Sequence, residues 1–117
     1  MASLRVYICN DPQHDELVRM IRDIVSNVKG ERPRVEVKRI KKLSSAEDFP
    51  YYVRQLEEYF GRIATAEFRK YGIESLPAVV FNDQLVLQGK VPTLEELEEA
   101  LAYAGLRISR VRGRAQP

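Results

Sequence analysis

The sequence predicts an α/β fold with a four-stranded mixed sheet and helices on both of its faces. Three observations predict it: short apolar stretches typical of strands, longer stretches with apolar residues every three or four positions, and the alternation of the two kinds along the chain. The expected order of elements is β-α-β-α-β-β-α. Two β-α-β crossovers would make the first three strands parallel, and a closing hairpin would add an antiparallel fourth strand.

Length and composition are those of one globular domain. The chain has 117 residues, of which 44% are apolar and 31% are charged. We expect the domain over residues 1–105. A basic tail follows over residues 106–117, with arginines from Arg107 to Arg114 and no acidic residue.

The first half of the chain predicts a strand, a helix and a second strand. Residues 4–9 are apolar at nearly every position, which is typical of a strand in the middle of a sheet. Asp11 suits a helix N-cap and Pro12 the first helical position, and the helical pattern runs to about Gly30. Residues 34–40 alternate apolar and polar, which predicts a strand with one wet face or at a sheet edge.

A second helix is expected over residues 50–72. Pro50 fits its first turn, apolar residues then mark one face as far as Tyr71, and Gly72 ends it. Gly61 lies inside this pattern and leaves open whether the helix is continuous, bent or broken in two.

A hairpin and a last helix complete the fold. Residues 78–81 and 85–88 read as strands joined by a turn. Thr93 and Glu96 have the spacing of a capping box, which predicts the start of the last helix. Its acidic residues, at positions 95, 96, 98 and 99, are expected on the solvated face.

The stretch that leads into the hairpin resembles the C-terminal half of thioredoxin-like proteins. A Tyr71-Gly72-Ile73 step ends a helix, Pro77 stands directly before a strand, and Gly89 follows the hairpin. The chain is similar to small archaeal glutaredoxin-like thioredoxins over most of residues 4–104. The resemblance implies the thioredoxin-like fold and a cis peptide bond between Leu76 and Pro77, beside a groove that binds partners.

The sequence departs from this family where the redox motif of its active members stands. In those members a Cys-x-x-Cys pair at the start of the first helix faces the cis proline, and the helix N-terminus lowers the pKa of the leading thiol. Here that position holds the stretch from Asn10 to His14, which contains no sulfur. The dithiol oxidoreductase activity of the family is therefore not expected.

The groove itself is expected to remain, because the fold builds it whether or not cysteines are present. An extended peptide can pair with the strand edge beside the proline through its main chain alone. We therefore expect a non-dithiol protein- or peptide-binding module, an adaptor with a protein or peptide partner. The residues expected to line the groove are Asn10, Asp11, Pro12, Gln13, His14, Leu76 and Pro77.

Cys9, the one cysteine of the chain, offers an alternative function. It could be the catalytic centre of a monothiol redox or sulfur-carrier protein, with the helix N-terminus favouring the thiolate. It could equally be a small buried apolar residue at the end of a central strand. A carboxylate nearby, such as that of Asp11, would raise the pKa of the thiol and weaken it as a nucleophile.

His14, the one histidine, also allows two interpretations. It could act as a general base that Asp11 or Asp15 orients, or it could be an exposed residue at a helix start. One histidine and one cysteine make no zinc site, and the sequence has no glycine-rich phosphate loop. We expect neither a metal nor a cofactor.

Aromatic residues of the second helix suggest a surface for a second copy of the chain. Tyr51, Tyr52 and Tyr59 flank the apolar face and, with Phe60, could form an apolar patch in a homodimer. The alternative is ordinary packing in the core and at its boundary.

The tail from Arg107 to Arg114 could contact nucleic acid or an acidic partner, or it could be a solvated chain end. No apolar stretch approaches the roughly 18 residues that a membrane span needs, and the N-terminus has no apolar leader segment. We expect a cytoplasmic protein without membrane contacts.

Overall fold

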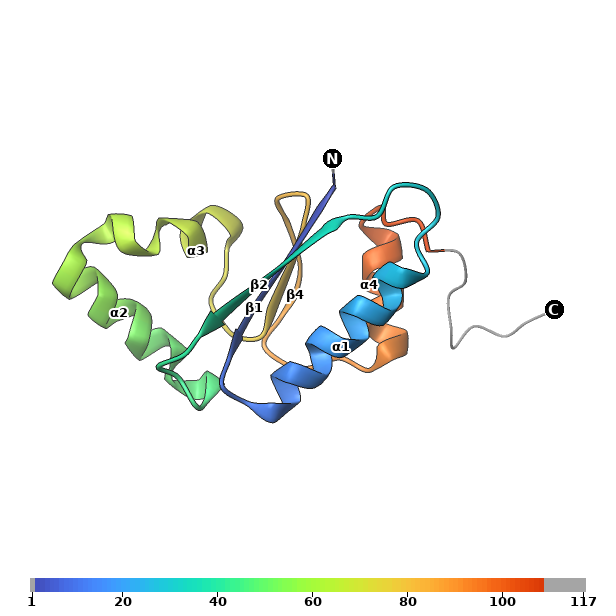
Figure 1. The fold of residues 1–117 in the computed structure, drawn as a ribbon. Helices are drawn as coiled ribbons and strands as arrows, with labels where there is room; N and C mark the ends of the chain where they lie inside the picture. The colour runs from blue at the N-terminus through green and yellow to red at the C-terminus, as the bar shows by residue number, and fades with distance from the viewer. Residues whose placement is uncertain (1, 109–117) are drawn as a thin grey trace.

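A four-stranded sheet separates two layers of helices in the computed structural model of the protein, which describes residues 2–108 (Figure 1). This architecture confirms the α/β fold class with a mixed sheet. The elements are, in order, β1 (Ser3–Cys9), α1 (Pro12–Ser26), β2 (Arg34–Ile40), the 3-10 turn η1 (Ala46–Asp48), α2 (Phe49–Phe60), the 3-10 turn η2 (Arg62–Thr65), α3 (Ala66–Tyr71), β3 (Ala78–Phe81), β4 (Gln84–Gln88) and α4 (Leu94–Tyr103).

The strand order of the sheet is β2-β1-β3-β4, so that β2 and β4 form its edges. β1 runs parallel to β2 over its whole length, and Cys9 lies beside Ile40 at the end of the pair. β3 runs antiparallel to β1, with Tyr7 beside Ala78, and antiparallel to β4. The hairpin turn has positive φ angles at two residues, Asn82 and Asp83, as two-residue hairpin loops require.

The direction of β3 shows that the prediction of three parallel strands is wrong. β2 ends beside Cys9, and β3 begins at Ala78, near the same end of β1. The connection therefore leaves and re-enters the sheet at one end. It does so because α2 leads away from the sheet and η2 and α3 lead back (Figure 1). A parallel crossover would have required the chain to return at the opposite end.

The larger core lies between the sheet and the helices α1 and α4. Alternate side chains of β1 and β3 point to this face, where they meet the apolar stripes of the two helices. Its buried members are Leu4, Val6, Ile8, Leu17, Ile21, Ile24, Val28, Val79, Phe81, Leu97, Leu101 and Leu106.

A smaller core lies on the other face of the sheet, beneath α2, η2 and α3, which we call the arm. Phe49 is the one buried residue of α2, so only the first turn of that helix is anchored in the core. The buried members of this core are Tyr7, Cys9, Leu43, Phe49, Tyr71, Ile73, Leu76, Ala78 and Val80.

The arm is two helical segments and not the single helix that one apolar face would suggest. The break falls at Gly61, whose φ of 82° and ψ of 174° are accessible essentially to glycine alone. Polar bonds hold the two segments together across the break. Thr65 and Arg69 both donate to a carboxylate oxygen of Glu57, at 2.6 and 2.8 Å, and Thr65 is fully buried.

The last described residues still pack on the domain. Leu106 is buried, the backbone N–H of Lys29 donates to the carbonyl of Arg107 at 2.9 Å, and Ile108 forms an isolated bridge with Val28. Residues 106–108, which the sequence analysis assigned to the tail, therefore contact the domain. The arginines at positions 110, 112 and 114 lie outside the described residues.

Candidate functional site

The start of α1 forms an exposed rim where the redox motif of relatives would stand. The Asp11 carboxylate accepts a hydrogen bond from the Gln13 backbone N–H at 2.9 Å and so caps the helix, as its N-cap position predicts. The backbone N–H of Asn10 donates to the carbonyl of Leu43 at 2.8 Å, which ties the rim to the loop after β2. Asn10, Pro12 and Gln13 are exposed.

The other side of the predicted groove is the entry to β3. The peptide bond between Leu76 and Pro77 is cis. The pairing of β1 with β3 begins at Tyr7 and Ala78, and Leu76 and Cys9, just beyond this pair, belong to the same buried cluster. The two sides are therefore adjacent. Cys9, His14, Leu76 and Pro77 are all buried, so the predicted groove has an exposed rim and a closed floor.

His14 and Cys9 are in contact beneath this rim. The backbone N–H of Cys9 donates to Nδ1 of His14 at 3.1 Å, and the Cys9 sulfur lies 3.5 Å from the same nitrogen. Only 3% of His14 is exposed, so the interpretation of an exposed helix-start residue is wrong. The reason is that a side chain in the first turn leans toward the helix N-terminus, and here that direction leads to the end of β1.

Burial keeps both groups of this pair neutral. It lowers the pKa of His14 from its usual value, although Asp11 and Asp15 act in the opposite direction. Burial also raises the pKa of the Cys9 thiol, and the Asp11 carboxylate adds to that increase. An attacking cysteine needs a lowered pKa and an accessible sulfur. Cys9 has neither, and its catalytic role stays a prediction.

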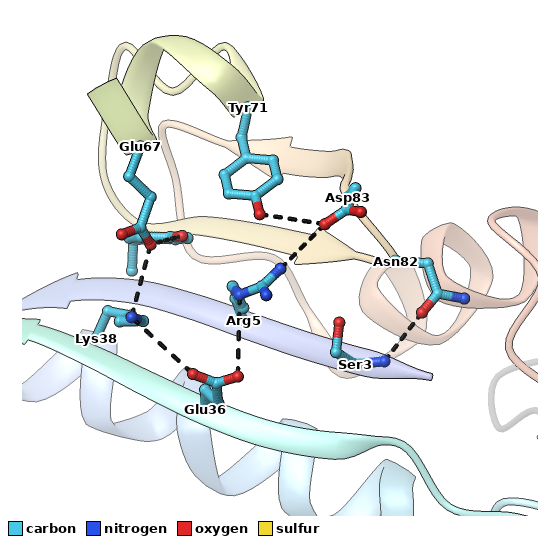
Figure 2. Close-up of polar contacts among 9 residues, drawn as sticks. Ser3, Arg5, Glu36, Lys38, Glu67, Tyr71, Asn82 and Asp83 are labelled. Carbon is cyan, nitrogen blue, oxygen red and sulfur yellow. Dashed lines mark hydrogen bonds and ion pairs between the residues drawn. The ribbon is translucent and has the colours of Figure 1, made fainter. Parts of the chain in front are cut away.

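A cluster of charged side chains lies between the sheet and α3, where the sequence predicted no site (Figure 2). Arg5 of β1 is 3.9 Å from Glu36 and 3.2 Å from Asp83. Lys38 of β2 lies 4.0 Å from Glu36 and 3.7 Å from Glu67 of α3. The charges alternate in sign across the cluster, so they offset one another.

Two tyrosines complete the charged cluster. The hydroxyl of Tyr7 donates to Glu67, and that of Tyr71 donates to Asp83 at 3.1 Å. The guanidinium of Arg5 lies 5.4 Å from the centre of the Tyr71 ring, within the range of a cation–π contact (Figure 2). Burial, followed by the bond to Glu67, raises the pKa of Tyr7 far above its usual range.

This cluster lines a cavity of about 460 Å³. Arg5, Glu36, Lys38 and Glu67 all have an opposite charge within 4 Å, so we assign the cavity a structural role. Sequence reasoning could place Glu36 and Lys38 on one face of their strand by alternation. It could not find their partners in β1 and α3, because those depend on the packing of distant segments.

A larger concave surface lies between β4 and α4, and sequence reasoning missed it as well. It is a groove of about 790 Å³. β4 contributes Gln84 and Val86 to one wall, and α4 contributes Glu96, Glu99 and Tyr103 to the other. The signals were present separately, as a last strand and an acidic helix. Their proximity follows from the position of β4 at the sheet edge beside α4.

The groove between β4 and α4 is acidic. Glu99 is exposed, and a hydrogen bond from the Thr93 backbone N–H lowers the pKa of Glu96 and keeps it ionised. Tyr103, at the end of α4, is 95% exposed. Glu98 is an exception to the solvated face expected for this run: it is 2% exposed, because it falls on the inner side of α4 between Leu97 and Leu101.

Comparison with known proteins agrees with the fold. Residues 55–102, from α2 to α4, match the family model of the thioredoxin domain. The protein is thioredoxin-like. No curated protein and no solved structure matches the chain. The matched region begins after the rim at the start of α1, so the likeness of this thioredoxin-like chain to the family model lies in its second half.

Two further features are absent from residues 2–108. These residues contain no group of three histidine, cysteine, aspartate or glutamate side chains placed to hold a metal ion. Within the same range, every helix is too short or too polar to cross a membrane.

Proposed function

We propose that this thioredoxin-like protein is a binding module for an extended, basic peptide segment of a partner protein, and that it acts without dithiol chemistry. The observation that carries the proposal is the open edge of β4 along the acidic groove. The groove that faces Pro77 supports the proposal less, because its floor is closed by buried side chains.

The edge of β4 offers main-chain groups to an added strand. β4 pairs with β3 on one side, and within residues 2–108 nothing pairs with its other side. An extended peptide can bind there through backbone hydrogen bonds, as in other cases of strand addition. The register shifts between Val79 and Val80, which pair with Leu87 and Leu85, so Val86 bulges. The regular edge is short, and we expect micromolar affinity.

The side chains around this edge favour a basic peptide with apolar residues at alternate positions. Glu96 and Glu99 face the groove with negative charge, and the exposed Tyr103 ring suits a lysine or arginine by a cation–π contact. Ala100 and Val86 give the groove apolar surface. Because the side chains of an extended peptide alternate in direction, basic and apolar side chains would reach different walls.

The alternative function, in which Cys9 is a monothiol redox or sulfur-carrier centre, has less support. Its sulfur is buried and the pKa of its thiol is raised. A reaction at this sulfur would require the end of β1 to open first.

A peptide selected on the full chain from a displayed library of random ten-residue sequences is the probe for this proposal. It is labelled with fluorescein and titrated by fluorescence anisotropy. Gln84→Trp, which fills the β4 end of the groove, should weaken binding by about tenfold or more. Gln13→Trp is the matched control, because it places the same ring on an exposed glutamine at the rim of α1.

A charge reversal tests the chemistry of the peptide. Glu99→Lys should weaken binding and reduce its dependence on salt, and Glu31→Lys, at an exposed acid outside the groove, should do neither. Circular dichroism verifies that each variant is folded. If the library yields no binder, the function is wrong. If Gln13→Trp abolishes binding and Gln84→Trp does not, the peptide occupies the groove beside Pro77 and our placement is wrong.

A further inference from the structure

The end of the arm carries three large apolar side chains in contact with solvent. Tyr59, Phe60 and Ile63, which we call the tip, are 75%, 70% and 84% exposed. The rings of Tyr59 and Phe60 lie side by side, with centres 6.5 Å apart. Exposed apolar side chains gathered in one segment of a protein surface commonly mark an interaction site.

The tip is held in place and is not a frayed chain segment. It spans the break at Gly61, and on the inner side of that break Arg69 bonds to Glu57, to Thr65 and to the carbonyl of Arg62. The buried hydroxyl of Thr65 also donates to Glu57. Because the polar side chains occupy the inside of the turn, the apolar ones are directed outward.

We infer that the tip is the interface of a homodimer in which two copies meet arm to arm about a two-fold axis. The arm projects from the sheet on the side away from α1 and α4, so two tips can meet without contact between the two sheets (Figure 1). This inference is independent of the peptide groove, which lies at the other side of the molecule between β4 and α4.

The size of the patch fits a weak, reversible self-association. Side chains of this size bury roughly 150–250 Å² each, so three of them at these exposures offer about 400 Å² per copy. Both copies together would bury about 800 Å², which is below the roughly 1,000 Å² of stable specific interfaces and is typical of weak, reversible ones. A dimer with micromolar affinity is therefore expected.

The tip carries exposed charges of both signs, which two copies can pair under two-fold symmetry. Glu58 and Arg62 are exposed and stand two residues before and two residues after Phe60. A two-fold axis near Phe60 that sets Glu58 of each copy against Arg62 of the partner subunit would form this ion pair twice. Because the tip carries one acid and one base, a second copy can supply the opposite charge to both, and this favours a second copy as the occupant.

Sedimentation of the full chain between about 2 and about 200 µM tests the dimer, since this range brackets a micromolar dissociation constant. The wild type should convert from monomer to dimer with rising concentration. Ile63→Glu should shift the midpoint at least about tenfold upward. Tyr103→Glu is the matched control, because Tyr103 is as exposed but lies on α4. A wild type that remains monomeric, or an Ile63→Glu variant that dimerises as well, overturns the inference.

A mixing experiment tests the two-fold arrangement. Glu58→Arg alone and Arg62→Glu alone should each dimerise weakly, since each places like charges together twice. An equimolar mixture of the two variants should regain the wild-type midpoint, because positions 58 and 62 of facing copies then carry opposite charges in both contacts. If the wild type dimerises but the mixture does not recover, the two-fold axis near Phe60 is wrong.

Discussion

The backbone N–H of Cys9 donates to Nδ1 of His14, and this bond fixes the proton of the neutral ring on Nε2. The same nitrogen lies 3.5 Å from the Cys9 sulfur, so the thiol and the imidazole share one buried contact. In a reactive cysteine–histidine pair the thiol loses its proton and the ring gains one. Here burial disfavours both changes, because each would place a charge in an apolar environment.

Thiol labelling should find Cys9 protected in the native state. Its side chain is fully buried and the pKa of its thiol is raised. A maleimide at neutral pH should modify the native chain at least about 100-fold more slowly than the chain unfolded in urea. The variant Cys9→Ala/Gln13→Cys, with its thiol at the exposed rim, should react quickly without urea. Fast labelling of native Cys9 would instead favour the monothiol function.

The free energy of unfolding should fall as the pH drops below the pKa of an ordinary histidine. Below about pH 6.5 the unfolded chain binds a proton at His14, whereas the native chain, with its lowered pKa, does not until the pH is lower still. The loss is at most about 1.4 kcal/mol per pH unit from this one group. Urea unfolding between about pH 5 and pH 8 measures it.

The variant His14→Asn separates this effect from the titration of carboxylates. The asparagine Oδ1 can accept the Cys9 N–H bond but does not titrate. The pH dependence of the difference between wild type and variant therefore belongs to His14. Parallel curves for the two proteins would show that the native pKa of His14 is not lowered.

At alkaline pH the free energy of unfolding should fall because of Tyr7. Above about pH 10 an unfolded tyrosine loses its proton, whereas native Tyr7 retains it because its pKa is raised by burial and Glu67. At pH 8 the free energy of unfolding of Tyr7→Phe should be about 1–2 kcal/mol lower than that of the wild type, because Glu67 loses a hydrogen-bond donor. Above pH 10 the free energy of unfolding of this variant should also fall less steeply with pH than that of the wild type. Curves of equal slope would contradict the raised pKa.

Removal of Arg69 should loosen the arm. Arg69→Ala takes away the bonds to Glu57 and Thr65 and should lower the free energy of unfolding by about 1–2 kcal/mol. Hydrogen exchange should become faster over residues 57–71. Arg54→Ala, at an exposed arginine of α2, should change the free energy by less than about 0.5 kcal/mol. Equal effects of the two variants would show that Arg69 does not hold the break together.

Local patterns were sufficient to predict most of the elements. The apolar run at residues 4–9, the Asp11 cap, the Thr93–Glu96 capping box and the hairpin all occur as the sequence predicts. Each of these signals involves neighbours in the chain, so it does not depend on how distant segments pack.

Features that depend on distant segments could not be predicted in this way. Gly61 showed only that a helix could break. The structure adds that the break reverses the chain and thereby sets the direction of β3. The burial of His14 and the bond from Tyr7 to Glu67, 60 residues apart, likewise follow from tertiary packing. The closed floor beside Pro77 belongs to the same class, since it is made by β1, α1 and the entry to β3.

The arm leaves the sheet and re-enters it at the same end. Its length is therefore independent of the dimensions of the rest of the protein. One helical turn of about 5.4 Å could be added to α2 and another to α3 without changing the register of any strand. Insertions or deletions of equal length in α2 and α3 would only lengthen or shorten the arm. A lineage could therefore vary how far this protein reaches while every other part of the molecule stays where it is.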